Sequence, residues 1–193
     1  MTAIDSHAAS LGAKLKEERV RYAIAGYTDL HGNLKGKVVP IDHFTHMAGG
    51  SELFTGAALD GLPQDVSDEE LSARPDLSRG VVLPWRRDVA LFLSDLYEGG
   101  QPFEASSRNI LRRQIDAAAD MGFTFNLGVE TEFFVFSGDP RNPQNVSDRD
   151  TLEKSCYAIP TLLDNLPWLS RLVDAMNELG WDVYSFDHED AQG

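Results

Sequence analysis

Short apolar runs alternate with turn-forming polar residues along the first half of the chain. Residues 8–19 place Leu11 and Leu15 one helical turn apart, with lysines and glutamates between them, which predicts an amphipathic helix. Four further apolar runs predict β-strands, and they cover residues 21–27, 34–40, 81–83 and 89–96. Residues 29–33 separate the first two strands and have the composition of a hairpin turn. Several strands with one or two helices predict a small mixed α+β domain.

A change in composition follows these strands. The segment Tyr97–Pro102 contains two adjacent glycines and a proline, which are typical of a linker or turn. We therefore expect two domains, one at residues 1–101 and one at residues 102–193. The length of 193 residues allows this division.

Helical and extended patterns alternate again in the second half. The predicted elements are helices at residues 107–121 and 167–179 and strands at residues 125–136 and 181–186. Gly122 and Gly180 directly follow the two helices and are typical helix stops. Two strands are too few for a stable sheet. The second domain is therefore predicted to be only the beginning of a larger one, as in a truncated chain.

The net charge and the cysteine content limit which binding partners and which cellular compartment are expected. The formal net charge of −14 disfavours binding to nucleic acid or to an anionic membrane, because both would be repelled. The single cysteine, Cys156, allows no intrachain disulfide and is expected to be a packing residue. The start of the chain lacks a signal-peptide pattern, and no apolar run is long enough to span a membrane. We expect a cytoplasmic protein.

Two acidic residues interrupt the apolar run at residues 125–136. In a strand Glu130 and Glu132 would project from the same face, where their charges repel unless a cation or proton compensates them. Mg²⁺ and Mn²⁺ prefer such carboxylate oxygens. A second acidic cluster, Asp187–Asp190, follows the next predicted strand. The pattern predicts either a shared metal site or, alternatively, two solvent-facing acidic surfaces.

Several segments, taken in order, resemble the N-terminal part of the glutamine synthetase family. Gly128–Phe134 resembles the family's Gly-x-Glu-x-Glu-Phe metal strand, and His188–Gly193 resembles the start of its second metal motif. The other matching segments are Tyr27–Gly32, Phe54–Gly61, Arg74–Leu77, Leu83–Trp85, Asp95–Gly100, Pro102–Glu104 and Arg108–Arg113. The resemblance spans almost the whole chain.

The resemblance implies a fold and an activity. It implies a β-grasp-like N-terminal domain followed by the beginning of a glutamine-synthetase-type α/β catalytic domain. The activity would be an ATP-dependent ligase that joins an amine to the γ-carboxylate of glutamate through a γ-glutamyl phosphate. Mg²⁺ or Mn²⁺ would be bound by Glu130, Glu132 and Glu189. His188 would support Glu189 without coordinating the metal itself.

The family resemblance also implies assembly into a ring-type homo-oligomer, a dodecamer of stacked hexameric rings. Members of the family are much longer than this chain, and their remaining metal ligands and phosphate-binding arginines lie further along. The chain on its own is therefore expected to be inactive. Catalytic side chains and nucleotide-binding residues are not assigned within it. The alternatives are a non-catalytic relative that serves in regulation or assembly, and a binding domain with acidic loops.

The substrate loop, Phe54–Gly61, bears on the amine. Family members that use ammonia resemble Phe-Asp-Gly-Ser-Ser here, and the aspartate position is occupied by Thr55 in this chain. A neutral hydroxyl attracts a compact cation less strongly, which favours a primary alkylamine such as methylamine, with γ-glutamylmethylamide as product. Alternatively, Asp60 serves ammonium and Thr55 is an ordinary loop residue, so methylamine and ammonia both stay open.

Overall fold

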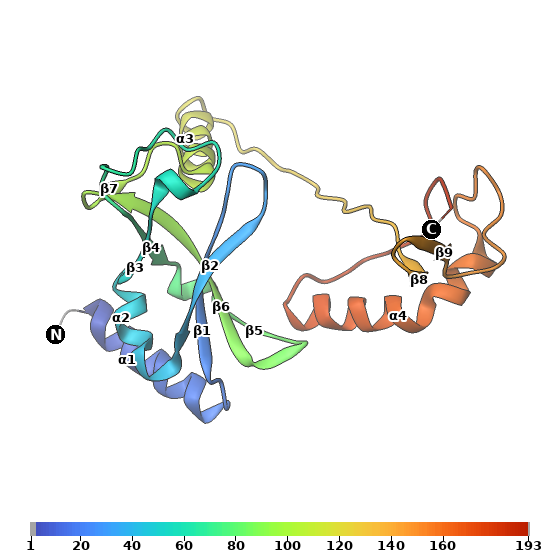
Figure 1. The fold of residues 1–193 in the computed structure, drawn as a ribbon, viewed down its shortest axis with the longest axis horizontal. Helices are drawn as coiled ribbons and strands as arrows, with labels where there is room; N and C mark the ends of the chain where they lie inside the picture. Colours follow the sequence, from blue (N-terminus) through green and yellow to red (C-terminus); the bar gives the residue numbers. More distant parts are fainter. Residues whose placement is uncertain (1–2, 193) are drawn as a thin grey trace. The chain divides into compact units, whose positions relative to one another are not determined.

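The computed structural model describes residues 3–192, with side chains in the first helix described from Ser6 onward. The described chain is mixed α+β and separates into two compact units, Met1–Asn126 and Leu127–Gly193 (Figure 1). These units reflect compactness, and the predicted domain boundary between residues 101 and 102 stays a prediction. The helices of the first unit are α1 (Ala3–Glu17), α2 (Phe44–Ala48) and α3 (Ser107–Asp120).

One mixed sheet organises the first unit. Its strands are β1 (Tyr22–Thr28), β2 (Leu34–Pro40), β3 (Glu52–Phe54), β4 (Leu71–Pro75), β5 (Val81–Leu83), β6 (Arg86–Glu98) and β7 (Gln101–Pro102). The main order is β2-β1-β6-β4-β3, with β5 and β7 also paired to β6. Only β1 and β6 run parallel among these described pairs, with Ala23 opposite Ala90. The long strand β6 is therefore the centre of the sheet.

The two ends of this sheet approach each other, so that it is nearly closed. The Nζ atom of Lys37 on β2 donates a hydrogen bond to the backbone oxygen of Leu53 on β3. The same ammonium lies 5.1 Å from the centroid of the Phe54 ring, within the range of a cation–π contact. A side chain thus links two edge strands that share no backbone ladder.

The core lies between the sheet and the helices α1 and α2, which lie together on one side of it (Figure 1). Phe44 of α2 meets Phe92 of β6 with ring centroids 5.2 Å apart, and both side chains are fully buried. Small residues of β1, Ala23 and Ala25, leave room for this contact. A Cβ at Gly80 would lie 2.0 Å from the Phe92 ring, which explains why glycine is required there.

Most predicted elements of the first unit are confirmed. The predicted strands 34–40 and 81–83 coincide with β2 and β5, and the predicted helix at residues 8–19 corresponds to α1. The strands β3 and β4 were not predicted. The second of them carries Arg74 and Pro75 within a segment that reads as a polar loop. Its strand conformation depends on pairing with the second half of β6, where Arg74 lies opposite Asp95.

Tyr27 packs on β1 beside the β1–β2 hairpin. Its ring meets Phe54 edge-on at 4.9 Å, and its side chain is buried. Its hydroxyl has no hydrogen-bond partner among the described residues. Burial, together with the nearby charge of Asp29, raises the pKa of the Tyr27 phenol to about 12. Asp29 itself accepts hydrogen bonds from the backbone N–H groups of His31 and Asn33, which fixes the hairpin tip.

The helix α3 is attached to the sheet by polar contacts. The buried Asn109 amide donates to the backbone oxygens of Leu96 at 3.0 Å and Phe103 at 2.9 Å. Arg108 donates to Asp95 on β6 at 2.8 Å. The N-cap of α3 is Ser106, and the hydroxyl of the next residue, Ser107, donates to the backbone oxygen of Thr28 at 2.8 Å. The helix begins at residue 107, as predicted, and ends at Asp120.

The second unit contains one long helix and a small hairpin. Its elements are β8 (Phe136–Asp139), β9 (Asn142–Asn145) and α4 (Ile159–Glu178). The hairpin lies in a segment expected to be a loop, and α4 begins before the predicted start at residue 167. Its end agrees with the prediction, since Gly180 adopts φ +81°, a conformation that favours glycine. Within the described residues, no helix has the length and apolar character needed to cross a membrane.

The two strands predicted at residues 125–136 and 181–186 are wrong for the chain as described. Apart from Phe136, which begins β8, neither segment forms a β-ladder. Their apolar side chains stay exposed, including Val129 at 77% and Tyr184 at 100%. A strand needs a neighbour for its backbone groups, and the described residues provide none for these segments.

We predict that Asn109→Ala lowers the free energy of unfolding by about 2 kcal/mol, because two hydrogen bonds from a buried amide are lost at about 1 kcal/mol each. The measurement is urea denaturation followed by circular dichroism. Gln114→Ala is the matched control, since it removes an exposed amide from the same helix and should change stability by less than about 0.5 kcal/mol. Equal effects of the two substitutions would contradict the anchoring role of Asn109.

We predict that the fold loses stability between about pH 10 and pH 12 through Tyr27. In the unfolded chain this phenol ionises near pH 10, whereas in the fold it stays protonated up to about pH 12. Rising pH therefore favours the unfolded state across this interval. Urea denaturation at stepped alkaline pH should show a shallower loss for Tyr27→Phe than for wild type. Parallel losses in the two proteins would contradict the assignment.

Candidate functional site

The acidic pair on the first predicted metal segment lies in extended, solvent-exposed chain. Glu130 and Glu132 are both exposed, and the segment around them has no strand neighbour. Phe133, directly after Glu132, contacts Trp168 of α4 with ring centroids 5.9 Å apart. This aromatic contact packs the segment against α4, which belongs to the same unit. The two carboxylates are therefore accessible to a ligand from solvent.

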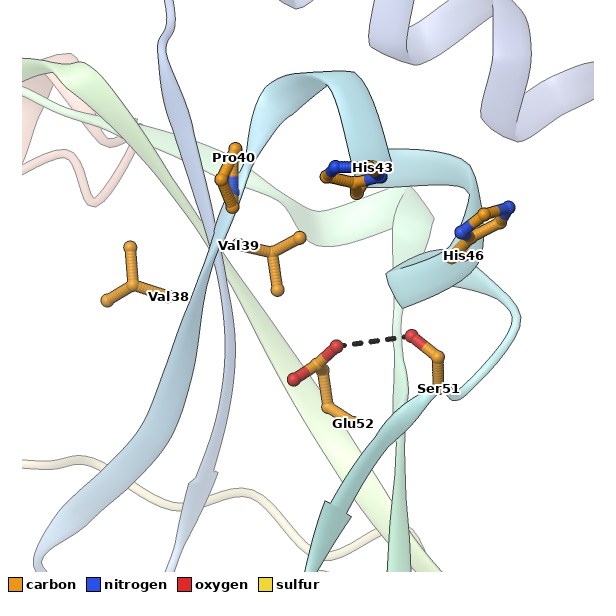
Figure 2. Close-up of a pocket in the computed structure, with 7 residues that line it drawn as sticks. All are labelled: Val38, Val39, Pro40, His43, His46, Ser51 and Glu52. Atoms are coloured by element: carbon orange, nitrogen blue, oxygen red, sulfur yellow. Dashed lines mark hydrogen bonds between the residues drawn. The ribbon is translucent and has the colours of Figure 1, made fainter.

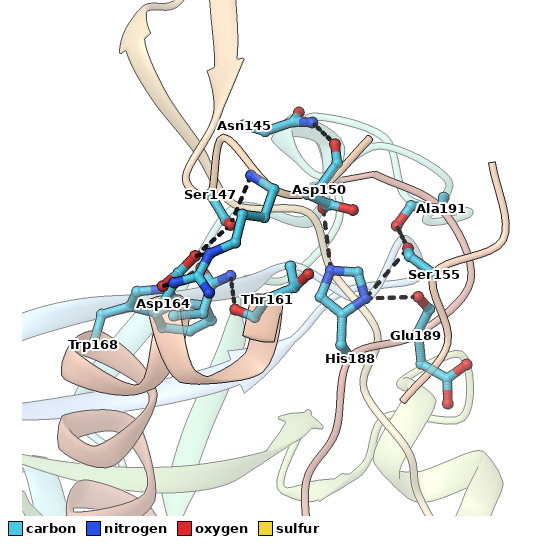
Figure 3. Close-up of polar contacts among 12 residues, drawn as sticks. Asn145, Ser147, Asp150, Ser155, Thr161, Asp164, Trp168, His188, Glu189 and Ala191 are labelled. Atoms are coloured by element: carbon cyan, nitrogen blue, oxygen red, sulfur yellow. Dashed lines mark hydrogen bonds and ion pairs between the residues drawn. The ribbon is translucent and has the colours of Figure 1, made fainter. Parts of the chain in front are cut away.

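Glu189 lies in a segment of the same unit that forms several hydrogen bonds with other segments. Its carboxylate is exposed and accepts a long hydrogen bond from the Cys156 thiol at 3.7 Å. The preceding residue, His188, is buried at 8% exposure and contacts Asp150 and the backbone of Glu189 (Figure 3). Sequence reasoning named His188 as a support for Glu189. It missed Asp150, which carries no distinguishing signal in a loop rich in Asp, Asn and Ser.

The three predicted metal ligands have the right chemistry but are not gathered into one cluster by the described residues. Carboxylate oxygens suit a hard divalent cation, so the donor set of Glu130, Glu132 and Glu189 fits Mg²⁺ or Mn²⁺. Among residues 3–192, no group of three or more His, Cys, Asp or Glu side chains is arranged to hold a metal ion. The assignment of these three residues stays a prediction.

Cys156 is unsuited to act as a nucleophile. Its pKa is raised by burial, then by the negative charges of Asp190 and Glu189 and by the hydrogen bond to Glu189. The reactive form of cysteine is the thiolate, and a raised pKa keeps the thiol protonated near neutral pH. This agrees with the expectation that Cys156 has a structural role.

The substrate loop lies in the first unit, where the β1–β2 hairpin holds it. Asp60 is 2.7 Å from the Nε2 atom of His31, and both side chains are exposed. A Cβ at Gly61 would lie 3.1 Å from Leu30, and Gly61 adopts φ +82°. A cavity of about 10 Å³ remains between the hairpin, the loop and the start of α3. It is no larger than one water molecule requires, so these three segments are tightly packed.

Thr55 has an acidic neighbour that sequence reasoning did not identify. Its hydroxyl donates to Oε1 of Glu70 at 3.2 Å, and both residues are exposed. Gly56 follows, and a Cβ there would overlap the end of the Gln64 side chain, which would have to move. The position that is neutral in the sequence therefore lies next to a carboxylate in the structure.

A further cavity of about 410 Å³ opens between β2 and the start of β3 (Figure 2). Its lining includes the stacked rings of His43 and His46, with centroids 6.1 Å apart, and Glu52, which accepts a hydrogen bond from Ser51 at 3.1 Å. No sequence motif pointed to this region. It contains no residue of the predicted site.

Comparisons with known proteins bear on this arrangement. The family model "Glutamine synthetase, catalytic domain" matches residues 104–193. A glutamine synthetase of Rhizobium leguminosarum bv. phaseoli is 36% identical over 186 residues, which are 95% of this chain and 41% of the relative. A glutamate–methylamine ligase of Methyloversatilis universalis is 33% identical over 180 residues, with 93% and 41% covered.

Solved structures give a similar result. The structure "GmaS/ADP complex-Conformation 1" superposes with a TM-score of 0.78 at 25% identity, covering 93% of this chain and 41% of that one. The structure "Apo GmaS without ligand" has a TM-score of 0.78 at 26% identity. The chain thus spans about 41% of the length of the relatives it matches. Residues 104–193 therefore match the catalytic domain of the glutamine synthetase family, and almost the whole chain is similar to the first part of proteins of that family.

Proposed function

We propose that the intact protein is an ATP-dependent ligase that joins an amine to the γ-carboxylate of glutamate. The observation that carries this proposal is that the catalytic-domain family model covers the segment holding Glu130, Glu132 and Glu189. Glutamate would first accept a phosphoryl group from ATP to form γ-glutamyl phosphate, and the amine would then displace phosphate. The whole-protein activity is inferred from relatives that are more than twice as long as this chain.

The metal requirement follows from the charge of the reactants. A bound Mg²⁺ or Mn²⁺ neutralises phosphate oxygens and holds nucleotide and acceptor together. In this chain Glu130, Glu132 and Glu189 would hold such ions, because their carboxylates are exposed and of the right donor type. The same proposal includes a β-grasp-like first domain, a catalytic domain that begins near residue 102, a ring-type homo-oligomer and a cytoplasmic location.

The identity of the amine is a finer question, on which the contact between Thr55 and Glu70 bears. An amine in its cationic form needs negative charge near its binding site. Thr55 is neutral, but Glu70 lies 3.2 Å from its hydroxyl and supplies that charge at the same place. We infer that Glu70 attracts the cationic amine, while the uncharged Thr55 makes the loop less polar beside it, which suits an alkyl group and favours methylamine over ammonia. Relatives of both kinds, a glutamine synthetase and a glutamate–methylamine ligase, resemble the chain.

We predict that Glu132→Ala reduces amide formation by the intact protein at least about 100-fold, because removing a metal ligand removes charge neutralisation during phosphoryl transfer. The assay measures phosphate and γ-glutamyl amide from glutamate, ATP and amine with Mg²⁺ or Mn²⁺. Glu153→Ala is the control, since it removes an exposed glutamate of the same unit outside both motifs. Undiminished turnover in Glu132→Ala would remove the metal role, and an inactive wild type would favour a non-catalytic relative.

We predict that Glu70→Gln raises the KM for methylamine about 10-fold, with little change in kcat, because the loss affects attraction of the cation rather than the chemical step. A panel of ammonia, methylamine and ethylamine measures the preference. Glu69→Gln is the matched control, because it neutralises the adjacent glutamate, which does not contact Thr55 through its side chain. An unchanged KM in Glu70→Gln would show that the attraction comes from another group.

A further inference from the structure

We propose that His188, held by Asp150, is a positioning residue that fixes the direction of the Glu189 carboxylate. This inference rests on the proposed function, which gives Glu189 a metal-binding role. The Nε2 atom of His188 lies 3.1 Å from Oδ2 of Asp150. The two side chains are only 6% and 2% exposed, so water does not weaken the pair. The pair connects segments that are 38 residues apart in the chain.

The other side of the imidazole ring fixes the backbone of Glu189 itself. The Nδ1 atom of His188 lies 2.9 Å from the backbone oxygen of Glu189 (Figure 3). The backbone oxygen of His188 accepts a hydrogen bond from the Tyr157 N–H at 2.7 Å. The peptide units on both sides of the Glu189 Cα are therefore held, and its side chain is directed away from this buried contact into solvent.

Strained backbone surrounds the same contact. Tyr157 and Ala191 adopt φ +63° and +116°, although neither is glycine. Each forms a hydrogen bond in the cluster, because Tyr157 donates to His188 and the backbone oxygen of Ala191 accepts from the Ser155 hydroxyl at 3.0 Å. Such conformations are unfavourable for residues other than glycine and are found preferentially at functional sites.

The loop that carries Asp150 is itself attached to the long helix α4. Asn145 donates to the backbone oxygen of Asp150 at 2.9 Å. In the same loop, Ser147 donates to Asp164 of α4 at 2.6 Å, and Arg149 pairs with the same carboxylate. Glu189 is thus connected through His188 and Asp150 to a loop that is itself fixed on α4. Residues that orient a metal ligand in this way typically change metal affinity or activity 10–100-fold when removed.

The test compares Asp150→Ala with wild type in the intact protein, using two readouts that do not require turnover. Hydrogen exchange of the peptide covering residues 186–191 should become faster, because its side-chain anchor is lost. Mn²⁺ titration followed by electron paramagnetic resonance should show Kd raised about 10–100-fold. Asp148→Ala is the matched control, since it removes an exposed aspartate from the same loop. It should change neither readout.

Further variants separate the possible outcomes. His188→Gln can still donate toward Asp150 and should retain part of the Mn²⁺ affinity that His188→Ala loses. If Asp150→Ala does not fold, Asp150→Asn keeps the volume and should show the same two changes to a smaller extent. Faster exchange with unchanged Mn²⁺ affinity would reduce the pair to a purely structural role and overturn the inference. Unchanged exchange would overturn the anchoring itself.

The outcomes also distinguish this inference from the proposed function. A wild type that binds Mn²⁺ through Glu189 but forms no γ-glutamyl amide would contradict the ligase and leave the positioning role intact. A wild type that forms the amide while Asp150→Ala binds Mn²⁺ normally would contradict only the positioning role. If Glu189→Gln binds Mn²⁺ as tightly as wild type does, the inference about Glu189 is overturned.

Discussion

The need of every backbone N–H and C=O group for a partner is the constraint that shapes both units of this chain. In the first unit the long strand β6 provides these partners, because β1 pairs with the first half of β6 and β4 pairs with the second half. In the second unit the segment that carries Glu130 and Glu132 is extended but pairs with no neighbouring strand among the described residues. The same alternating pattern therefore gives a strand in one place and an unpaired segment in the other.

This constraint explains how far local sequence patterns could predict the fold. The strands β2 and β5 coincide with their apolar runs, since a short run bounded by turn residues leaves few other conformations. The strand β4 could not be found in this way, because Arg74 and Pro75 are poor strand residues whose pairing is set by β6. The start of α4 was also missed, although Pro160 is well suited to the first turn of a helix.

In the candidate site, as in the fold, the sequence indicates residue types but not the contacts that these residues form. Glu130 and Glu132 were proposed as metal ligands because divalent cations prefer carboxylates, and Glu189 because its segment resembles a family motif. Their metal-binding role stays a prediction. The neighbours Glu70 and Asp150 could not be recognised from the sequence, since both lie in polar stretches where one acid resembles the next. Their significance comes from single side-chain contacts, to Thr55 and to His188, that only the folded chain defines.

The two predicted metal segments therefore differ in what holds them. A strand is fixed along its whole length by backbone ladders, so the direction of Glu130 and Glu132 depends on a neighbouring strand. The segment after residue 186 has no ladder, yet His188 fixes it through contacts with Asp150 and with the backbone of Glu189. A buried side-chain pair holds one point where a ladder would hold many, and that point adjoins the carboxylate. The contacts that direct Glu189 thus all lie within its own unit.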